Sequence, residues 1–179
     1  MDIYNFSQKD IDICNEFSNN VDTTFYSKRN QFDANKRKLD TKIGKLGELV
    51  VYNTLIKTTS DISYPDFKIY DAKSKSWDFD LKSSSMNIHV KTQEVLQSSK
   101  YGESWIFQNE DKKIFKTYSE NDFVAFVLVD ILNKNGQIRK LVKLKDLHDK
   151  NLFKKPKLIH LSSKSAVYYE DLEEAFKDD

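Results

Sequence analysis

Two consecutive stretches of the sequence, WDFDL and NIHVKTQ, alternate polar with apolar residues. Alternation with a period of two is typical of a β-strand that buries one face. The stretch SSSMN between them favours a turn, and on neighbouring strands with a common buried face the polar faces coincide. The polar positions of the two stretches are Asp78, Asp80, His89, Lys91 and Gln93.

Carboxylates and a lysine that converge at a sheet edge have a definite chemical use. Oxygen ligands hold Mg²⁺, which usually keeps several of its waters, and Mn²⁺ is a possible substitute. A bound ion of this kind stabilises charge that develops on a phosphate and lowers the pKa of an attacking water. A nearby lysine can orient that water or neutralise the phosphate. The chemistry indicated is phosphodiester hydrolysis.

A third acid precedes these strands. The stretch LDTKIGKLGELVVYNTLIK predicts a helix that Asp40 could cap. Two of the four glycines of the chain, Gly44 and Gly47, fall within it. A glycine inside a helix costs about 1 kcal/mol relative to alanine, so we expect the helix to approach a sheet closely. Glu48 lies beside these glycines and would face the sheet; the alternative is an exposed helix glutamate.

Glu48 in GKLGELVVY, Asp78 in SWDFDL and Lys91 in HVK, with twelve residues between Asp78 and Lys91, resemble the PD-(D/E)XK nuclease superfamily. Type II restriction enzymes, phage homing endonucleases and Holliday junction resolvases belong to that group. The resemblance covers about residues 40–130. It implies an α/β (α+β) fold with a restriction-endonuclease-like core, in which a mixed central sheet is flanked by helices in the order helix-β-β-β-(α)-β.

The resemblance also implies roles. Asp78 would be the metal-binding acid, Lys91 the catalytic lysine and Glu48 the helix acid found in many members. Gln93 would be an auxiliary polar group on the active face. Asp66, in the dipeptide Pro65-Asp66, also matches the motif letters, but it lies farther from the lysine.

One position departs from the family pattern. The residue two before the motif lysine is normally Asp or Glu, and here it is His89. His89 could be a metal ligand or proton shuttle, with Asp80 or Glu48 supplying the missing carboxylate. It could instead bind a phosphate or a structural water. Alternatively, the site is degenerate and the chain binds DNA without cutting it.

The function expected first is therefore a Mg²⁺-dependent DNA endonuclease of the homing or restriction type, making site-specific double-strand breaks. A single compact site cuts one strand, so a homodimer is possible. The alternatives are a catalytically degenerate nucleic-acid-binding protein on the same scaffold, a Holliday-junction-resolvase-like nuclease, and a small α/β protein with an ordinary lysine-bearing strand.

Composition is compatible with these functions. The 179 residues suffice for one domain, divided into a helical and basic extension (1–38), a catalytic core (39–145) and a helical C-terminal segment (146–179). No apolar run reaches membrane-spanning length, so we expect no membrane partner. The sequence has no glycine-rich phosphate loop, so we expect no nucleotide cofactor. The single cysteine, Cys14, has helical spacing to apolar neighbours and is expected in the core, and a cytoplasmic setting fits.

The net charge is only +1, but the charges are segregated. Residues 28–45 carry seven Lys or Arg against two acids, and residues 134–157 carry nine against two. We expect these stretches to contact DNA phosphates, although lysine-rich stretches are more often solvated surface.

The remaining pattern predicts the other elements. FSQKDIDICNEF is typical of a helix capped by Ser7. DFKIYD, SWDFDLK and NIHVKTQ predict three strands, DFVAFVLVDIL a buried central strand, and Asn135-Gly136 a tight turn. QSSKY is expected in a loop, and VKLKDLHDKNLF and YYEDLEEAF in helices. Trp105 and Phe107 either contact DNA or lie in the core. Both His148 and His160 are expected at the surface.

Overall fold

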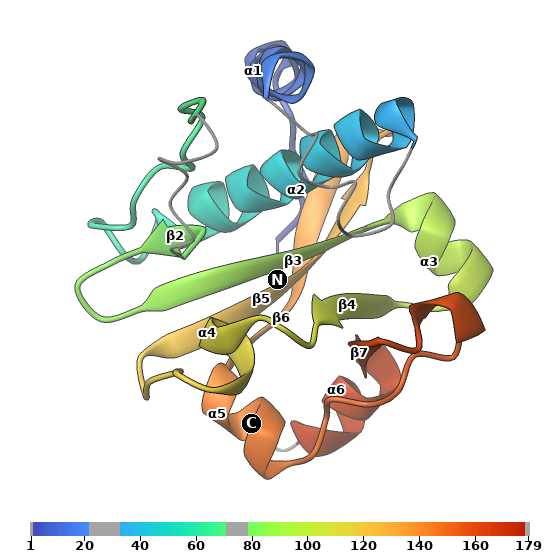
Figure 1. Cartoon of the computed structure of the whole chain (residues 1–179). Coiled ribbons are helices and arrows are strands. Elements are labelled where there is room, and N and C mark those ends of the chain that lie inside the picture. The colour runs from blue at the N-terminus through green and yellow to red at the C-terminus, as the bar shows by residue number, and fades with distance from the viewer. Residues whose placement is uncertain (1, 22–32, 71–78, 178–179) are drawn as a thin grey trace.

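The architecture is a mixed five-stranded sheet with helices on both faces, seen in a computed structural model that describes residues 2–21, 33–70 and 79–177 (Figure 1). The strand order is β1-β6-β5-β3-β2, and every neighbouring pair is antiparallel except β3 and β5, which are parallel. The strands are β1 (Tyr4–Asn5), β2 (Leu81–Lys82), β3 (Asn87–Glu94), β5 (Asp122–Asp130) and β6 (Asn135–Lys143). The chain is thus of the mixed α and β class.

One face of the sheet is covered by α2 (Ala34–Leu55), on which α1 (Gln8–Asn20) packs. The prediction that Asp40 caps this long helix is wrong. Asp33 caps α2 by accepting hydrogen bonds from the backbone N–H groups of the second and third helical residues. Asp40 lies inside the helix, where it pairs with Lys36 at the i,i+4 spacing. No helix breaker stands between positions 33 and 40, so the helix starts earlier.

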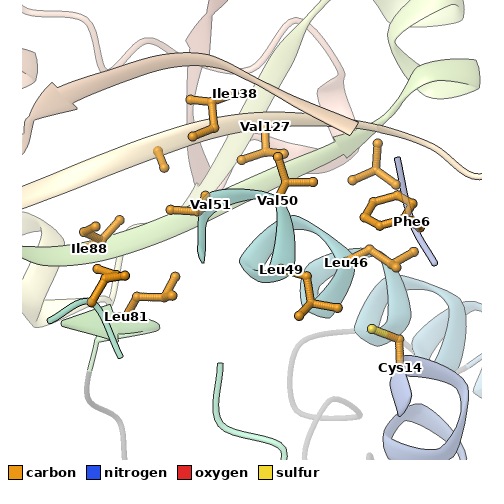
Figure 2. Packing of buried hydrophobic residues seen from close by; sticks show 13 residues of the cluster. Phe6, Cys14, Leu46, Leu49, Val50, Val51, Leu81, Ile88, Val127 and Ile138 are labelled. Carbon is orange, nitrogen blue, oxygen red and sulfur yellow. The ribbon is translucent and has the colours of Figure 1, made fainter. Parts of the chain in front are cut away.

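Close approach of α2 to the sheet occurs at one of the two predicted glycines. A Cβ at Gly47 would lie 1.9 Å from Thr92 Oγ1, so only glycine fits between the helix and β3. A Cβ at Gly44 would meet nothing within 4 Å. The core beside this contact joins α2 to the sheet through aliphatic side chains such as Leu46, Val50 and Ile88 (Figure 2).

The opposite face carries a second layer and a second core. Its elements are α3 (Val95–Tyr101), β4 (Ser104–Gln108), α4 (Lys112–Phe115), α5 (Leu144–Asp149), the short 3₁₀ helix η2 (Ile159–Leu161), β7 (Lys164–Tyr168) and α6 (Tyr169–Ala175). β4 and β7 form a separate antiparallel pair. Trp105 and Phe107 of β4 are fully buried against Phe126 of β5, so both aromatics belong to the core.

Most of the long predicted elements are confirmed. Ser7 and Asp10 form a capping box at the start of α1, and Cys14 is buried. The apolar run DFVAFVLVDIL forms β5 in the middle of the sheet, and the helices α5 and α6 occupy their predicted stretches. Among the described residues, no helix is long and apolar enough to cross a membrane.

Several local expectations are wrong. Residues 66–70 of the DFKIYD stretch form no strand, and of the described residues of SWDFDLK, 79–82, Leu81 and Lys82 form the strand. QSSKY lies in α3 rather than in a loop. His148 is half-buried and stacked on Tyr118 at 4.5 Å, whereas His160 is exposed as expected. The turn after β5 falls at residues 131–134, and Gly136 lies within β6, where a Cβ would come 2.7 Å from Val50 Cγ2.

Candidate active site at the edge of the sheet

Strand β3 divides the predicted site residues between its two faces. Ile88 and Val90 point towards α2 and join its core. The alternate residues point into the second layer, because Lys91 Nζ lies 4.8 Å from the centre of the Phe107 ring. The sheet therefore separates His89, Lys91 and Gln93 from the helix that carries Glu48.

Gln93 has a structural partner at each end of its amide. Its Nε2 donates to the carbonyl of Gly102 at 3.0 Å, and its Oε1 accepts from the backbone N–H of Ser104 at 2.9 Å. These bonds tie β3 to the loop that leads into β4.

Asp80 occupies the sheet edge between the two faces. It directly precedes β2, and its Oδ2 accepts a hydrogen bond from the backbone N–H of Val90 at 2.7 Å. Its charge raises the pKa of Glu48 on the helix side, and it favours the charged form of His89 on the other side. Asp80 thus acts electrostatically on both groups.

Glu48 is a buried carboxyl with a strongly perturbed ionisation. Glu48 is 8% exposed, and burial raises the pKa of its carboxyl to about 8. The charge of Asp80 acts in the same direction, while the charge and hydrogen bond of Lys45 oppose it. Two carboxyls held close together in a poorly solvated place repel each other when both ionise. Such groups are enriched at functional sites, although structural ion-pair networks perturb pKa values too.

Lys45 is the cation that pairs with Glu48, and the sequence patterns do not single it out. Its Nζ lies 2.7 Å from Glu48 Oε2 and donates to the backbone carbonyl of Asp66, also at 2.7 Å. The ammonium also lies 5.0 Å from the centre of the Phe17 ring and 5.5 Å from that of Phe67. The available signal was the i,i+3 spacing of Lys45 and Glu48 on the predicted helix.

His89 is buried on the other face. It is 7% exposed, its ring lies 4.8 Å from that of Phe79, and its Nε2 has no hydrogen-bond partner among the described residues. Burial lowers the pKa of His89; nearby Asp80 opposes this effect and Lys91 adds to it. The neutral imidazole is therefore favoured.

The remaining acids are placed as follows. Asp78 lies outside the described residues. Asp66 is engaged within its own loop, where its carboxylate accepts from Lys68 N at 2.8 Å and from the Tyr70 hydroxyl at 2.6 Å. Within residues 2–21, 33–70 and 79–177, no group of three or more His, Cys, Asp or Glu could hold a metal ion. Glu48 and Asp80 nevertheless supply carboxylate oxygens, and Mg²⁺ often needs only one or two carboxylates because it keeps several waters.

The basic stretch 134–157 is partly neutralised within the chain. Lys154 and Lys157 pair with Asp171 and Glu170 of α6 at 2.5 and 3.0 Å, and Lys145 pairs with Glu120 at 2.7 Å. The acid-rich C-terminal stretch therefore lies against part of the second basic one. In the stretch 28–45, residues 34–45 form the first half of α2, whose first turns are largely exposed.

Comparisons of the chain with protein-family models, with curated proteins and with solved structures find no significant match.

Proposed function

We propose that the protein is a divalent-metal-dependent DNA endonuclease of the PD-(D/E)XK type. The observation that carries this proposal is the pair of carboxyls Glu48 and Asp80. Glu48 lies on the helix that packs on β3, Asp80 bonds to the backbone of β3 from the sheet edge, and the charge of Asp80 raises the pKa of Glu48. A bound cation would relieve this repulsion.

The order of the elements also supports the proposal. Helix α2 precedes the hairpin β2–β3, and the chain then crosses over through α3 to β5, which lies parallel to β3. This order agrees only in part with the order that the resemblance implies, because the described residues lack its first strand, and β4 and α4 also lie between α3 and β5. Lys91 lies in the middle of β3, as the motif requires.

In this proposal Glu48 and Asp80 hold Mg²⁺ or Mn²⁺, and Asp78 is a further candidate ligand. When bound, the ion would stabilise charge on the phosphate and lower the pKa of the attacking water. The chain's own residues place the carboxylates: α2 fixes Glu48, while the bond from Val90 N fixes Asp80. The exposed first turns of α2 would contact phosphates, which position DNA without specifying its sequence. Duplex cleavage at a defined site would require two copies of this site, hence a homodimer.

A second function has a specific observation in its favour. The sheet separates Lys91 and His89 from Glu48, and Lys91 lies over an aromatic ring of the second layer. A nuclease scaffold that has lost its metal site would keep DNA binding without cleavage. This alternative is a non-catalytic nucleic-acid-binding protein.

Cleavage of supercoiled plasmid in Mg²⁺ or Mn²⁺ separates the two functions. We expect the wild type to nick or linearise varied DNA, and Glu48→Gln, Asp80→Asn and Asp78→Ala to lose about 100-fold or more in rate. Asp12→Asn is the matched control, because Asp12 is an exposed acid of α1 that bonds to Gln8. Salt-dependent DNA binding without any cleavage would favour the non-catalytic alternative. Unimpaired cutting by Glu48→Gln would refute the assigned site.

A further inference from the structure

Lys45, beside Glu48, and Lys91, the motif lysine, lie on different faces of the sheet. Lys45 Nζ is 2.7 Å from Glu48 Oε2, whereas Lys91 Nζ lies over Phe107 in the second layer. A group that assists phosphodiester hydrolysis must reach the phosphate where the carboxylates are, so geometry is the first criterion.

The surroundings of Lys45 hold its ammonium in place. Its side chain is 14% exposed, and the group lies among residues from three segments: Phe17 of α1, Glu48 of α2, and the 66–67 loop. A lysine ammonium has three donors, of which Glu48 and the Asp66 carbonyl engage two. A pre-positioned cation next to metal-binding carboxylates stabilises charge without reorganisation during the reaction.

We propose that Lys45, rather than Lys91, is the lysine of the Glu48–Asp80 site. This inference rests on the proposed endonuclease function and assigns Lys45 as the positively charged group of its site. In the DNA-free protein the ammonium donates to Glu48. During hydrolysis it donates to a non-bridging oxygen of the phosphate at the same carboxylates and offsets the negative charge there.

A purely structural role for Lys45 makes different predictions. Breaking a buried ion pair destabilises a protein, because the remaining charge is left without compensation. Such a loss would lower folding stability without a selective effect on the chemical step. Lys45→Gln removes the charge but keeps a hydrogen-bond donor, and Lys45→Arg keeps the charge. Lys57→Met is the matched control, because Lys57 forms an exposed ion pair with Asp2 at 3.7 Å, away from the site.

The experiment measures three quantities for each variant: the single-turnover cleavage rate in Mg²⁺, the affinity for the same duplex in EDTA, and the urea unfolding curve. For Lys45→Gln we expect cleavage about 100-fold slower, from the loss of one charge-stabilising group, with duplex affinity in EDTA close to that of the wild type. Lys45→Arg should cut at an intermediate rate, and Lys57→Met at the wild-type rate. The loss in Lys45→Gln should exceed the loss in Lys91→Gln.

Wild-type cleavage by Lys45→Gln, or a greater loss in Lys91→Gln than in Lys45→Gln, overturns this inference and leaves the endonuclease function standing. Absence of cleavage by the wild type overturns the proposed function and this inference with it. If Lys45→Gln does not fold, Lys45→Met, which also removes the charge, decides: slower cleavage at unchanged affinity supports the inference, and an unchanged rate overturns it.

Discussion

The contact between Gly47 and Thr92 sets how closely the Glu48-bearing helix approaches the sheet, and alanine substitution tests it. Gly44, one turn earlier in the same helix, is the internal control because a Cβ there meets nothing within 4 Å. Replacing a helical glycine by alanine gains about 1 kcal/mol in propensity. This gain applies at both positions and cancels in their comparison.

At Gly47 the new Cβ would lie 1.9 Å from Thr92 Oγ1 and 2.9 Å from Thr92 Cβ, so rotation of the threonine cannot remove the clash. Overpacking of this kind costs about 1–3 kcal/mol. We therefore expect Gly44→Ala to stabilise the fold by about 1 kcal/mol. Gly47→Ala should be less stable than Gly44→Ala by about 1–3 kcal/mol, or roughly 2–4 °C in Tm per kcal/mol at this chain length.

Urea unfolding followed by far-UV circular dichroism measures both free energies. Thr92→Ala supplies a further test, because it removes Oγ1 and should reduce the penalty of Gly47→Ala by at least about 0.5 kcal/mol in a double-mutant cycle. Equal stability of the two glycine variants, or no coupling to Thr92, would refute the close-approach argument.

Three other predictions concern charge. Burial raises the folded pKa of Glu48 from 4.5 to about 8. The contribution of Glu48 to folding stability is therefore complete below about pH 4.5 and is lost as pH rises to about 8. Urea unfolding should therefore show Glu48→Gln gaining up to a few kcal/mol on the wild type over that range, and a pH-independent difference would contradict this. The folded pKa of His89 is lowered from 6.5, so the contribution of the neutral His89 to folding stability is present above about pH 6.5 and is lost as pH falls. Thermal unfolding at acidic pH should show His89→Leu losing less stability than the wild type, and equal losses would argue against a buried neutral histidine. In DNA titrations by fluorescence anisotropy, replacing Lys36 and Lys38 by Gln should reduce the salt slope by up to about 0.9 per lysine, whereas an unchanged slope would exclude the start of α2 from the DNA contact.

Long periodic segments could be predicted from the sequence because their own residues determine them. The apolar run of β5 and the capping box at Ser7 are local signals, and both are confirmed. The predicted cap of α2 lies seven residues after the observed one, because Asp33 and Asp40 both satisfy the cap pattern and only the polar first turns of the helix separate them. Propensity alone does not decide between two such caps.

The candidate site was less predictable, because it depends on which face of β3 meets which layer. Alternation correctly placed His89 and Lys91 on one face, but it did not reveal that β4 and its aromatic residues cover that face. Nor did it show that α2 packs on the other face and brings Lys45 to Glu48. These facts come from contacts between segments far apart in the sequence.

The parallel pairing of β3 with β5 has a consequence for the order of folding. β5 and β6 are joined by a four-residue connection, 131–134, so their hairpin closes a short loop. β3 meets β5 only after the chain has crossed from Glu94 to Asp122, and ordering that longer loop has a larger entropic cost. The β5–β6 hairpin should therefore acquire amide protection before β3 in pulsed hydrogen exchange, and the edge that holds Asp80 should be among the last parts of the sheet to form.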